Sequence, residues 1–149
     1  MGLKINFVLE KMRTRYITRH YHGLEIKTII DYLPNLNRYY NFYCYSDTIK
    51  IGRSSLTYVH QKSKVYVKDF YIEEPYREKG HGSRFWEFVE NYIKRGCKPS
   101  EFLGRISDVD DFDLASSFWH KMGFEVVDNR SSPDGCFVGP ISKRVSETS

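Results

Sequence analysis

The segment that most constrains the fold of this chain is residues 76–83, which read Tyr-Arg-Glu-Lys-Gly-His-Gly-Ser. An extended, aromatic-rich run precedes it and a strongly amphipathic helical run follows it, which predicts a strand, a tight turn and a helix start. Gly80 and Gly82 stand at i and i+2 of that turn, with Arg77 and Lys79 beside them. Backbone N–H groups at such a helix start, together with the helix dipole, suit a phosphate or pyrophosphate. A side chain at either glycine would hinder close approach of an anion to the backbone.

A second motif lies at residues 115–125, Ala-Ser-Ser-Phe-Trp-His-Lys-Met-Gly-Phe-Glu. The pattern Arg77-x-x-Gly80-x-Gly82 resembles the acetyl-CoA loop of the GNAT-type N-acetyltransferase superfamily, and residues 115–125 look like that family's late helix, which ends in a Gly-Phe step. The two motifs occur in the family's order and the resemblance covers residues 65–125. Residues 1–60 carry no recognisable motif.

The resemblance implies an α/β fold: a mixed, partly parallel central sheet of about six to seven strands, flanked by helices, with a splayed strand pair that holds acetyl-CoA. The length of 149 residues fits a single domain, taken as residues 1–149.

Periodicity and turn signals predict the following elements in the first half of the chain: one or two strands in 5–21, a helix at 24–33, and strands at 39–45, 49–60 and 65–73. In the second half they predict a helix at 83–95 stopped by Gly96, a strand at 101–107, a further helix, and a final hairpin of 124–127 and 136–143. The further helix is expected to be capped by Asp111 or Asp113 and to carry Leu114, Phe118 and Met122 on one stripe.

The strand at 65–73 has an irregular phase. Val65 and Val67 fall on one face by period two, whereas Phe70 and Ile72 would fall on the other. A one-residue bulge near Lys68 or Asp69 would bring all four to one side. The alternative is a buried parallel strand that is covered on both faces.

The cofactor implied by the resemblance is acetyl-CoA, with CoA as product and no metal. The loop amides would take the pyrophosphate, the backbone of Tyr71 and Ile72 would pair with the pantetheine arm, and Trp119 would pack against that arm. The expected cofactor-binding residues are Tyr71, Ile72, Arg77, Glu78, Lys79, Gly80, His81, Gly82, Ser83 and Trp119.

The implied reaction is direct attack of a primary amine on the thioester. A lysine-like amine with a pKa near 10.4 is only about one part in 10³ neutral at pH 7, which costs roughly 4 kcal/mol. A carboxylate can take the proton, directly or through water. Glu73 and Asp69 are the catalytic candidates, and Glu74 is a third acid nearby. The alternatives are ordinary loop acids at Glu73 and Glu74 and, at Asp69, a buried acid bonded to local backbone.

Trp119 departs from the family pattern, because many members have at this position a Tyr proposed to protonate the leaving thiolate. An indole N–H donates a hydrogen bond but is not a usable acid. The family's Asn, three residues before Ala115, is here Phe112. Two hypotheses follow: an acetyl-CoA-dependent N-acetyltransferase, or a non-catalytic acyl-CoA-binding or partner-binding module of the same fold.

Charge suggests a third, weaker hypothesis. Residues 1–27 hold six Lys or Arg against two acids, which suits nucleic acid or simply a solvated strand face. The expected partner is an amine acceptor, whether a polyamine, an aminoglycoside or a protein amine, and a homodimer is left open. Three cysteines without metal spacing, no apolar run long enough to span a membrane and no leader favour a cytoplasmic protein with reduced thiols.

Overall fold

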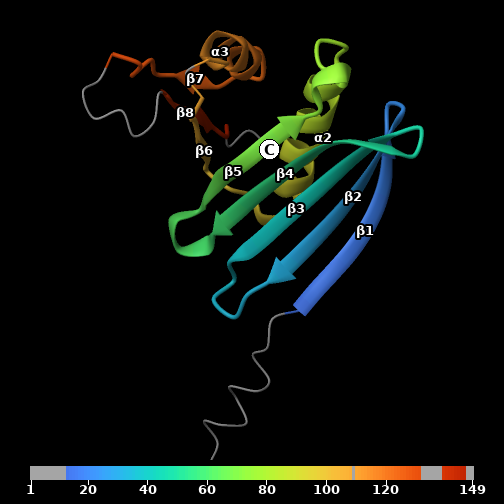
Figure 1. The fold of residues 1–149 in the computed structure, drawn as a ribbon. Coiled ribbons are helices and arrows are strands. Elements are labelled where there is room, and N and C mark those ends of the chain that lie inside the picture. Colours follow the sequence, from blue (N-terminus) through green and yellow to red (C-terminus); the bar gives the residue numbers. More distant parts are fainter. Residues whose placement is uncertain (1–12, 109, 132–138, 147–149) are drawn as a thin grey trace, which may run out of the picture.

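The computed structural model describes residues 13–108, 110–131 and 139–146. Within them, eight strands form one mixed sheet in the order β1-β2-β3-β4-β5-β6-β8-β7, accompanied by two α-helices (Figure 1). The elements are β1 (Arg13–Tyr21), β2 (Leu24–Tyr32), β3 (Arg38–Ser46), β4 (Ile49–Val59), η1 (His60–Lys62), β5 (Lys64–Ile72), η2 (Glu74–Tyr76), α2 (His81–Cys97), β6 (Glu101–Ile106), α3 (Phe112–Lys121), β7 (Glu125–Val126) and β8 (Gly139–Arg144).

Strands β1 to β5 form an antiparallel meander joined by short turns. β5 and β6 are parallel, because α2 crosses between them. The predicted mixed α/β architecture with a partly parallel sheet is therefore confirmed, with eight described strands rather than six to seven.

The predicted helix at residues 24–33 is wrong, because this segment is strand β2. Leu24, Ile26, Thr28 and Ile30 are buried in strict alternation, and hydrogen-bonded neighbours flank the strand on both sides. Thr28 supplies the buried position that the apolar count overlooked, and β-branched residues favour the pleated surface. Consequently, no α-helix precedes β5 in the part of the chain that the structure describes.

The predicted bulge in β5 is confirmed. Ser55 of β4 pairs with Asp69 and Leu56 pairs with Val67, so Lys68 is the extra residue. The bulge restores the phase, and Val65, Val67, Phe70 and Ile72 all pack against the hydrophobic core. β5 pairs with β6 only from Lys64 to Tyr66, so the two strands part before the bulge.

The core lies between the sheet and α2. Phe85, Trp86, Val89 and Ile93 of this helix are buried, as an amphipathic helix requires. α2 begins two residues earlier than expected and passes through Gly96, so the predicted stop at Gly96 is wrong. The helix ends at Cys97, and its C-cap Lys98 has a left-handed backbone. Gly96 remains helical with its backbone oxygen bonded to Arg38.

The apolar stripe predicted for α3 is wrong in part, since Leu114 is 63% exposed. Phe112 and Trp119 are the buried residues of this helix, and Asp111 is its N-cap without a side-chain cap bond. β7 pairs with β8 as the predicted final hairpin requires. Its turn at residues 132–135 and Cys136 lie outside the described residues.

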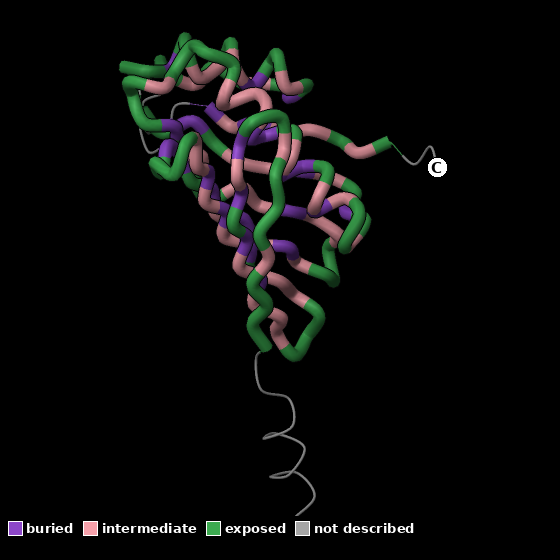
Figure 2. The backbone as a smooth tube through the Cα atoms, turned by 90° about the vertical axis from the view of Figure 1, so that its right-hand side faces the viewer, coloured by how far each residue is buried: buried purple, intermediate pink, exposed green. Residues whose placement is uncertain are grey.

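One face of the meander is left without a covering helix among the described elements (Figure 1). α2 packs on the opposite face, where Tyr40, Phe42 and Leu56 are buried. Seen from the β1 edge, exposed positions run along most of the edge strand (Figure 2). No helix in the described ranges is long and apolar enough to cross a bilayer.

Candidate active site

The loop between β5 and α2 ends in an uncapped helix N-terminus. Gly80 is the N-cap with φ of 81°, and no side chain caps this end of α2. The first amides of a helix have no intrahelical partner. A Cβ built on Gly80 would meet nothing within 4 Å, so this position is not crowded by neighbouring residues. The left-handed backbone is the reason that glycine suits this position.

Gly82 has a different role from the one expected. A Cβ at this position would lie 3.3 Å from Cε1 of Phe118 and 3.7 Å from Cγ1 of Ile72. The glycine therefore permits close packing of α2 against α3 and the end of β5. The missing side chain of Gly82 therefore leaves room for residues of the protein interior, rather than for an approaching anion.

Arg77 links the loop to the end of β5. Its Nε donates a hydrogen bond of 2.7 Å to the backbone oxygen of Ile72, and its guanidinium lies 5.1 Å from the centre of the Tyr71 ring. The side chain is held in place by these contacts, and Arg77 is exposed. Lys79 and Glu78 are exposed, and Glu78 has a positive φ of 63°.

His81 and Arg84 form a pair on the first turn of α2. Nη2 of Arg84 lies 2.7 Å from Nδ1 of His81, so this ring nitrogen accepts the bond. Partial burial, then the positive charges of Arg84 and Lys79, lower the pKa of His81. A neutral imidazole is the form that can accept from Arg84. Ser83 follows on the same turn and is half-buried.

The two candidate bases lie apart. Asp69 is on the face of β5 opposite to Phe70, where its carboxylate is 3.8 Å from Nε of Arg53. Glu73 follows the end of β5, is exposed, and donates its backbone N–H to the oxygen of Ile51. Glu74 begins the η2 turn and is also exposed. The two residues therefore have different partners, the Arg53 side chain for Asp69 and the Ile51 backbone for Glu73.

Trp119 lies in the core, with only 7% exposure. Its ring packs against Phe124 at 4.9 Å, Trp86 at 5.0 Å and Phe70 at 5.5 Å between ring centres. Phe118 stacks on Phe70 at 5.3 Å, and it is Phe118 that lies against Gly82. Spacing alone could not tell which of these adjacent aromatics borders the loop, and Phe118 is the residue that sequence reasoning missed.

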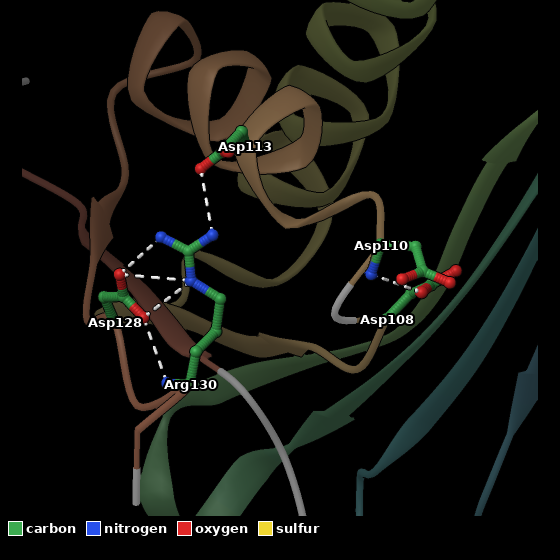
Figure 3. Close-up of polar contacts among 5 residues, drawn as sticks. All are labelled: Asp108, Asp110, Asp113, Asp128 and Arg130. Carbon is green, nitrogen blue, oxygen red and sulfur yellow. Dashed lines mark hydrogen bonds and ion pairs between the residues drawn. The ribbon is translucent and has the colours of Figure 1, made fainter.

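An acidic stretch joins β6 to α3 (Figure 3). Oδ1 of Asp108 accepts the backbone N–H of Asp110 at 2.9 Å. Across the helix start, Arg130 donates to Asp128 at 2.7 Å and to Asp113 at 3.2 Å, and its guanidinium covers the Phe112 ring at 4.3 Å. The hydrogen bonds from Arg130 lower the pKa of Asp128 to about 2. These contacts fix the chain after β7 to the start of α3.

Within the described residues, no grouping of His, Cys, Asp and Glu side chains is arranged to hold a metal ion. The thiols of Cys44 and Cys97 are free. Burial raises the pKa of Cys44 to about 12, which makes this thiol a poor nucleophile.

Solved acetyltransferases share this fold. Arabidopsis thaliana Naa50, bound to the bisubstrate analogue CoA-Ac-MVNAL, is 22% identical over 70% of this chain and 72% of its own, with a TM-score of 0.57. PaiA N-acetyltransferase from Thermoplasma acidophilum, bound to coenzyme A, is 22% identical over 70% and 60%, with a TM-score of 0.52. A GNAT-family acetyltransferase from Staphylococcus aureus is 13% identical over 74% and 68%, with a TM-score of 0.58. No protein-family model and no curated protein sequence matches the chain.

Proposed function

We propose that this chain, which has the GNAT fold, is an acetyl-CoA-dependent N-acetyltransferase that acts on a primary amine. The observation that carries the proposal is the uncapped N-terminus of α2, with Gly80 as its left-handed N-cap and no neighbour within 4 Å of the position of a Cβ there. This loop follows the strand that parts from its parallel neighbour. The solved relatives with coenzyme A or a CoA-containing analogue support the same reading by their fold.

The residues at the loop fit the diphosphate of a coenzyme. The amides of His81, Gly82 and Ser83 would donate to phosphate oxygens, and the dipole of α2 favours negative charge there. Arg77 is already held by Ile72 and Tyr71, so its free donors would be pre-oriented. Lys79 adds an exposed cation. Bound acetyl-CoA would supply the activated acetyl group.

Backbone groups of β5 beyond Tyr66 have no β6 partner, which leaves that edge for an extended ligand such as the pantetheine arm. The carbonyl of Ile72 already accepts from Arg77, so Ile72 would contribute its N–H. Tyr71 would contribute its ring, which lies beneath Arg77. Trp119 would support the arm indirectly through Phe70 and Phe118.

Removal of the proton from the attacking amine falls to Glu73 or Asp69. Both carboxylates are exposed enough to reach an acceptor or a bridging water. Glu73 stands between the end of β5 and the loop, whereas Asp69 lies beside the bulge, on the face of the sheet opposite α2. Replacement of the true base, as Glu73→Gln or Asp69→Asn, should lower kcat by about 10²-fold or more with unchanged CoA affinity.

The cofactor assignment is tested with an isosteric pair of variants at one position. Asn and Asp both tolerate a left-handed backbone, so Gly80→Asn and Gly80→Asp differ chiefly in charge. We expect Gly80→Asp to lose CoA binding in isothermal titration, and Gly80→Asn to retain more of it. Equal, wild-type affinity in both variants would show that the diphosphate is held elsewhere.

Activity is tested by release of free CoA thiol from acetyl-CoA over a panel of polyamines, aminoglycosides and peptides. A non-catalytic CoA-binding module is the second candidate, favoured by the buried indole at position 119 in place of an acidic hydroxyl. That candidate predicts a thermal shift with CoA but no thiol release with any amine.

A further inference from the structure

The face of the meander that no described helix covers carries an unusual set of side chains. We define the open face as the side of β1 to β5 opposite α2, and it is lined by Tyr16, Tyr39, Tyr43, Tyr45, Tyr66 and Tyr71. Ten of the chain's 12 tyrosines lie in these five strands. Tyr16 is 74% exposed, Tyr39 is 45% and Tyr71 is 38%.

The same strands carry the chain's net positive charge. β1 to β5 contain nine Lys or Arg and three Asp or Glu, a net charge of +6. The whole chain has 23 and 19, which leaves 14 against 16, or −2, for the remaining residues. The register places Arg13, Arg15, Arg19 and Arg38 on the α2 side of the sheet, opposite core-facing residues of β2 or bonded to α2. The open face therefore carries the other five cations and all three acids, a net charge of +2. This positive surplus complements a polyanion rather than a second copy of the same face.

Cations and tyrosine rings alternate across the open face. Nζ of Lys27 lies 4.8 Å from the Tyr45 ring centre, and Nζ of Lys50 lies 5.3 Å from that of Tyr43. Arg53 lies 5.8 Å from the Tyr71 ring centre, and Lys68 lies 5.8 Å from that of Tyr66. In the described ranges, no acid lies within ion-pair distance of Lys50 or Lys68.

The acids of this face are already engaged. Glu25 lies 4.0 Å from Lys27, Asp69 lies 3.8 Å from Arg53, and Asp31 accepts from Thr14 at 2.7 Å. A hollow of about 370 Å³ runs over β3 and β4 between Asp31 and Lys68, beside the ring of Tyr39. Polar groups of Asn41 and Ser55 line its floor.

We propose that the open face binds single-stranded nucleic acid, with bases stacked on the tyrosine rings and phosphates beside the lysine and arginine side chains. Tyr43 and Tyr45 stand two residues apart on one strand, about 7 Å along it, so each ring can receive a separate base. A flat sheet face lacks the protruding helix or ribbon that enters a duplex groove, whereas unpaired bases can lie flat on it. This activity is separate from acetyl transfer.

The test is fluorescence anisotropy of the full chain with fluorescein-labelled 15-nucleotide oligo-U and oligo-dT. Binding is expected with both, and the Kd should rise about tenfold or more between 50 and 200 mM KCl if three phosphates are neutralised. Tyr43→Ala with Tyr45→Ala should weaken binding about fivefold or more, whereas the two Phe replacements should retain it. Circular dichroism and thermal unfolding check that each variant is folded.

Matched charge reversals separate the open face from net charge. Lys27→Glu with Lys50→Glu should abolish binding, whereas Arg95→Glu with Lys98→Glu, two exposed cations at the far end of α2, should leave most of it. Equal loss in both pairs, equal affinity for a 15-base-pair duplex, or no anisotropy change at 50 mM KCl would each overturn the proposal. None of these variants alters the loop at residues 77–83, so CoA binding stays an independent readout.

Discussion

Two glycines two residues apart serve two different physical needs in this protein. Gly80 adopts a left-handed backbone beside open space, and Gly82 lies against Phe118 and Ile72. A β-carbon is costly at the first through backbone strain and at the second through contact. The pair therefore joins an uncapped helix end to the packing that holds it.

Gly82→Val is expected to lower the free energy of unfolding by about 2 kcal/mol, because the new side chain overlaps Phe118 and Ile72. Urea unfolding measures the change. Phe118→Ala creates space at the same point, so the double variant should be less destabilised than the sum of the two single variants. Additive effects would contradict the contact.

Cys44 is fully buried, and burial raises the pKa of its thiol to about 12, with Arg84 opposing the shift. In a variant where the other cysteines are serine, Cys44 should not react with Ellman's reagent at pH 8 until denaturant is added. Because the folded pKa lies above the ordinary value of 9.0, the unfolded chain loses this proton first. Stability should therefore fall as pH rises from about 9 to 12, and Cys44→Ala should flatten that slope. Rapid labelling of the native protein would contradict this.

At the scale of elements, the position of helix α3 against the core determines the surroundings of the Trp119 side chain. Its indole lies among Phe70, Trp86 and Phe124, with 7% exposure. This position is a packing site, and a hydroxyl introduced there would be buried.

Trp119→Tyr is accordingly expected to destabilise the protein by about 2 kcal/mol and to leave the rate of thiol release no higher than wild type. Trp119→Phe is the control, since it loses volume without burying a hydroxyl. A rate increase in Trp119→Tyr alone would show that a phenol at this position reaches the reacting sulfur.

The segment after β7 is held to α3 by Arg130. Its hydrogen bonds lower the pKa of Asp128 to about 2, so this contribution to stability is present above the ordinary value of 3.8. It should be lost as pH falls from about 4 to 2, and Arg130→Gln should be less sensitive to that change. Acid titration followed by near-ultraviolet circular dichroism measures it, and identical acid profiles would contradict the clamp.

At the scale of the whole molecule, one buried carboxylate ties three elements together. Glu90 of α2 is 7% exposed and accepts bonds from Lys143 of β8 at 2.9 and 3.0 Å, and from Trp86 at 3.0 Å. Lys143 also donates to the backbone oxygen of Met122 at 2.8 Å. The network joins the crossover helix, the last strand and the end of α3.

Lys143→Met should cost about 2 kcal/mol of unfolding free energy, because it leaves Glu90 with fewer donors and the Met122 oxygen without its lysine. Glu90→Gln in the same chain should recover part of that loss, since the buried charge is gone. Thermal and urea unfolding of the cycle measure the coupling. A Lys143→Met variant as stable as wild type would show that the network is not needed.

Sequence predicted the strand–turn–helix at residues 65–95 because three signals agree there: alternation, glycines and helical spacing. The bulge was also legible, since Val67 and Phe70 can share a face only if one residue is extra. The helix predicted at residues 24–33 was wrong because the spacing of Leu24, Ile26 and Ile30 is compatible with a strand as well as with a helix. Only pairing with the neighbouring strands β1 and β3 selects the strand.

By itself, the sequence determined the turn at residues 76–83 and, to within two residues, the start of helix α2, because these depend on local backbone preferences. Tertiary structure decided that Gly82 and Trp119 serve packing, and that no helix of the described residues covers the tyrosine-lined face of the sheet. Those properties depend on contacts between residues far apart along the chain, so a local sequence pattern does not predict them.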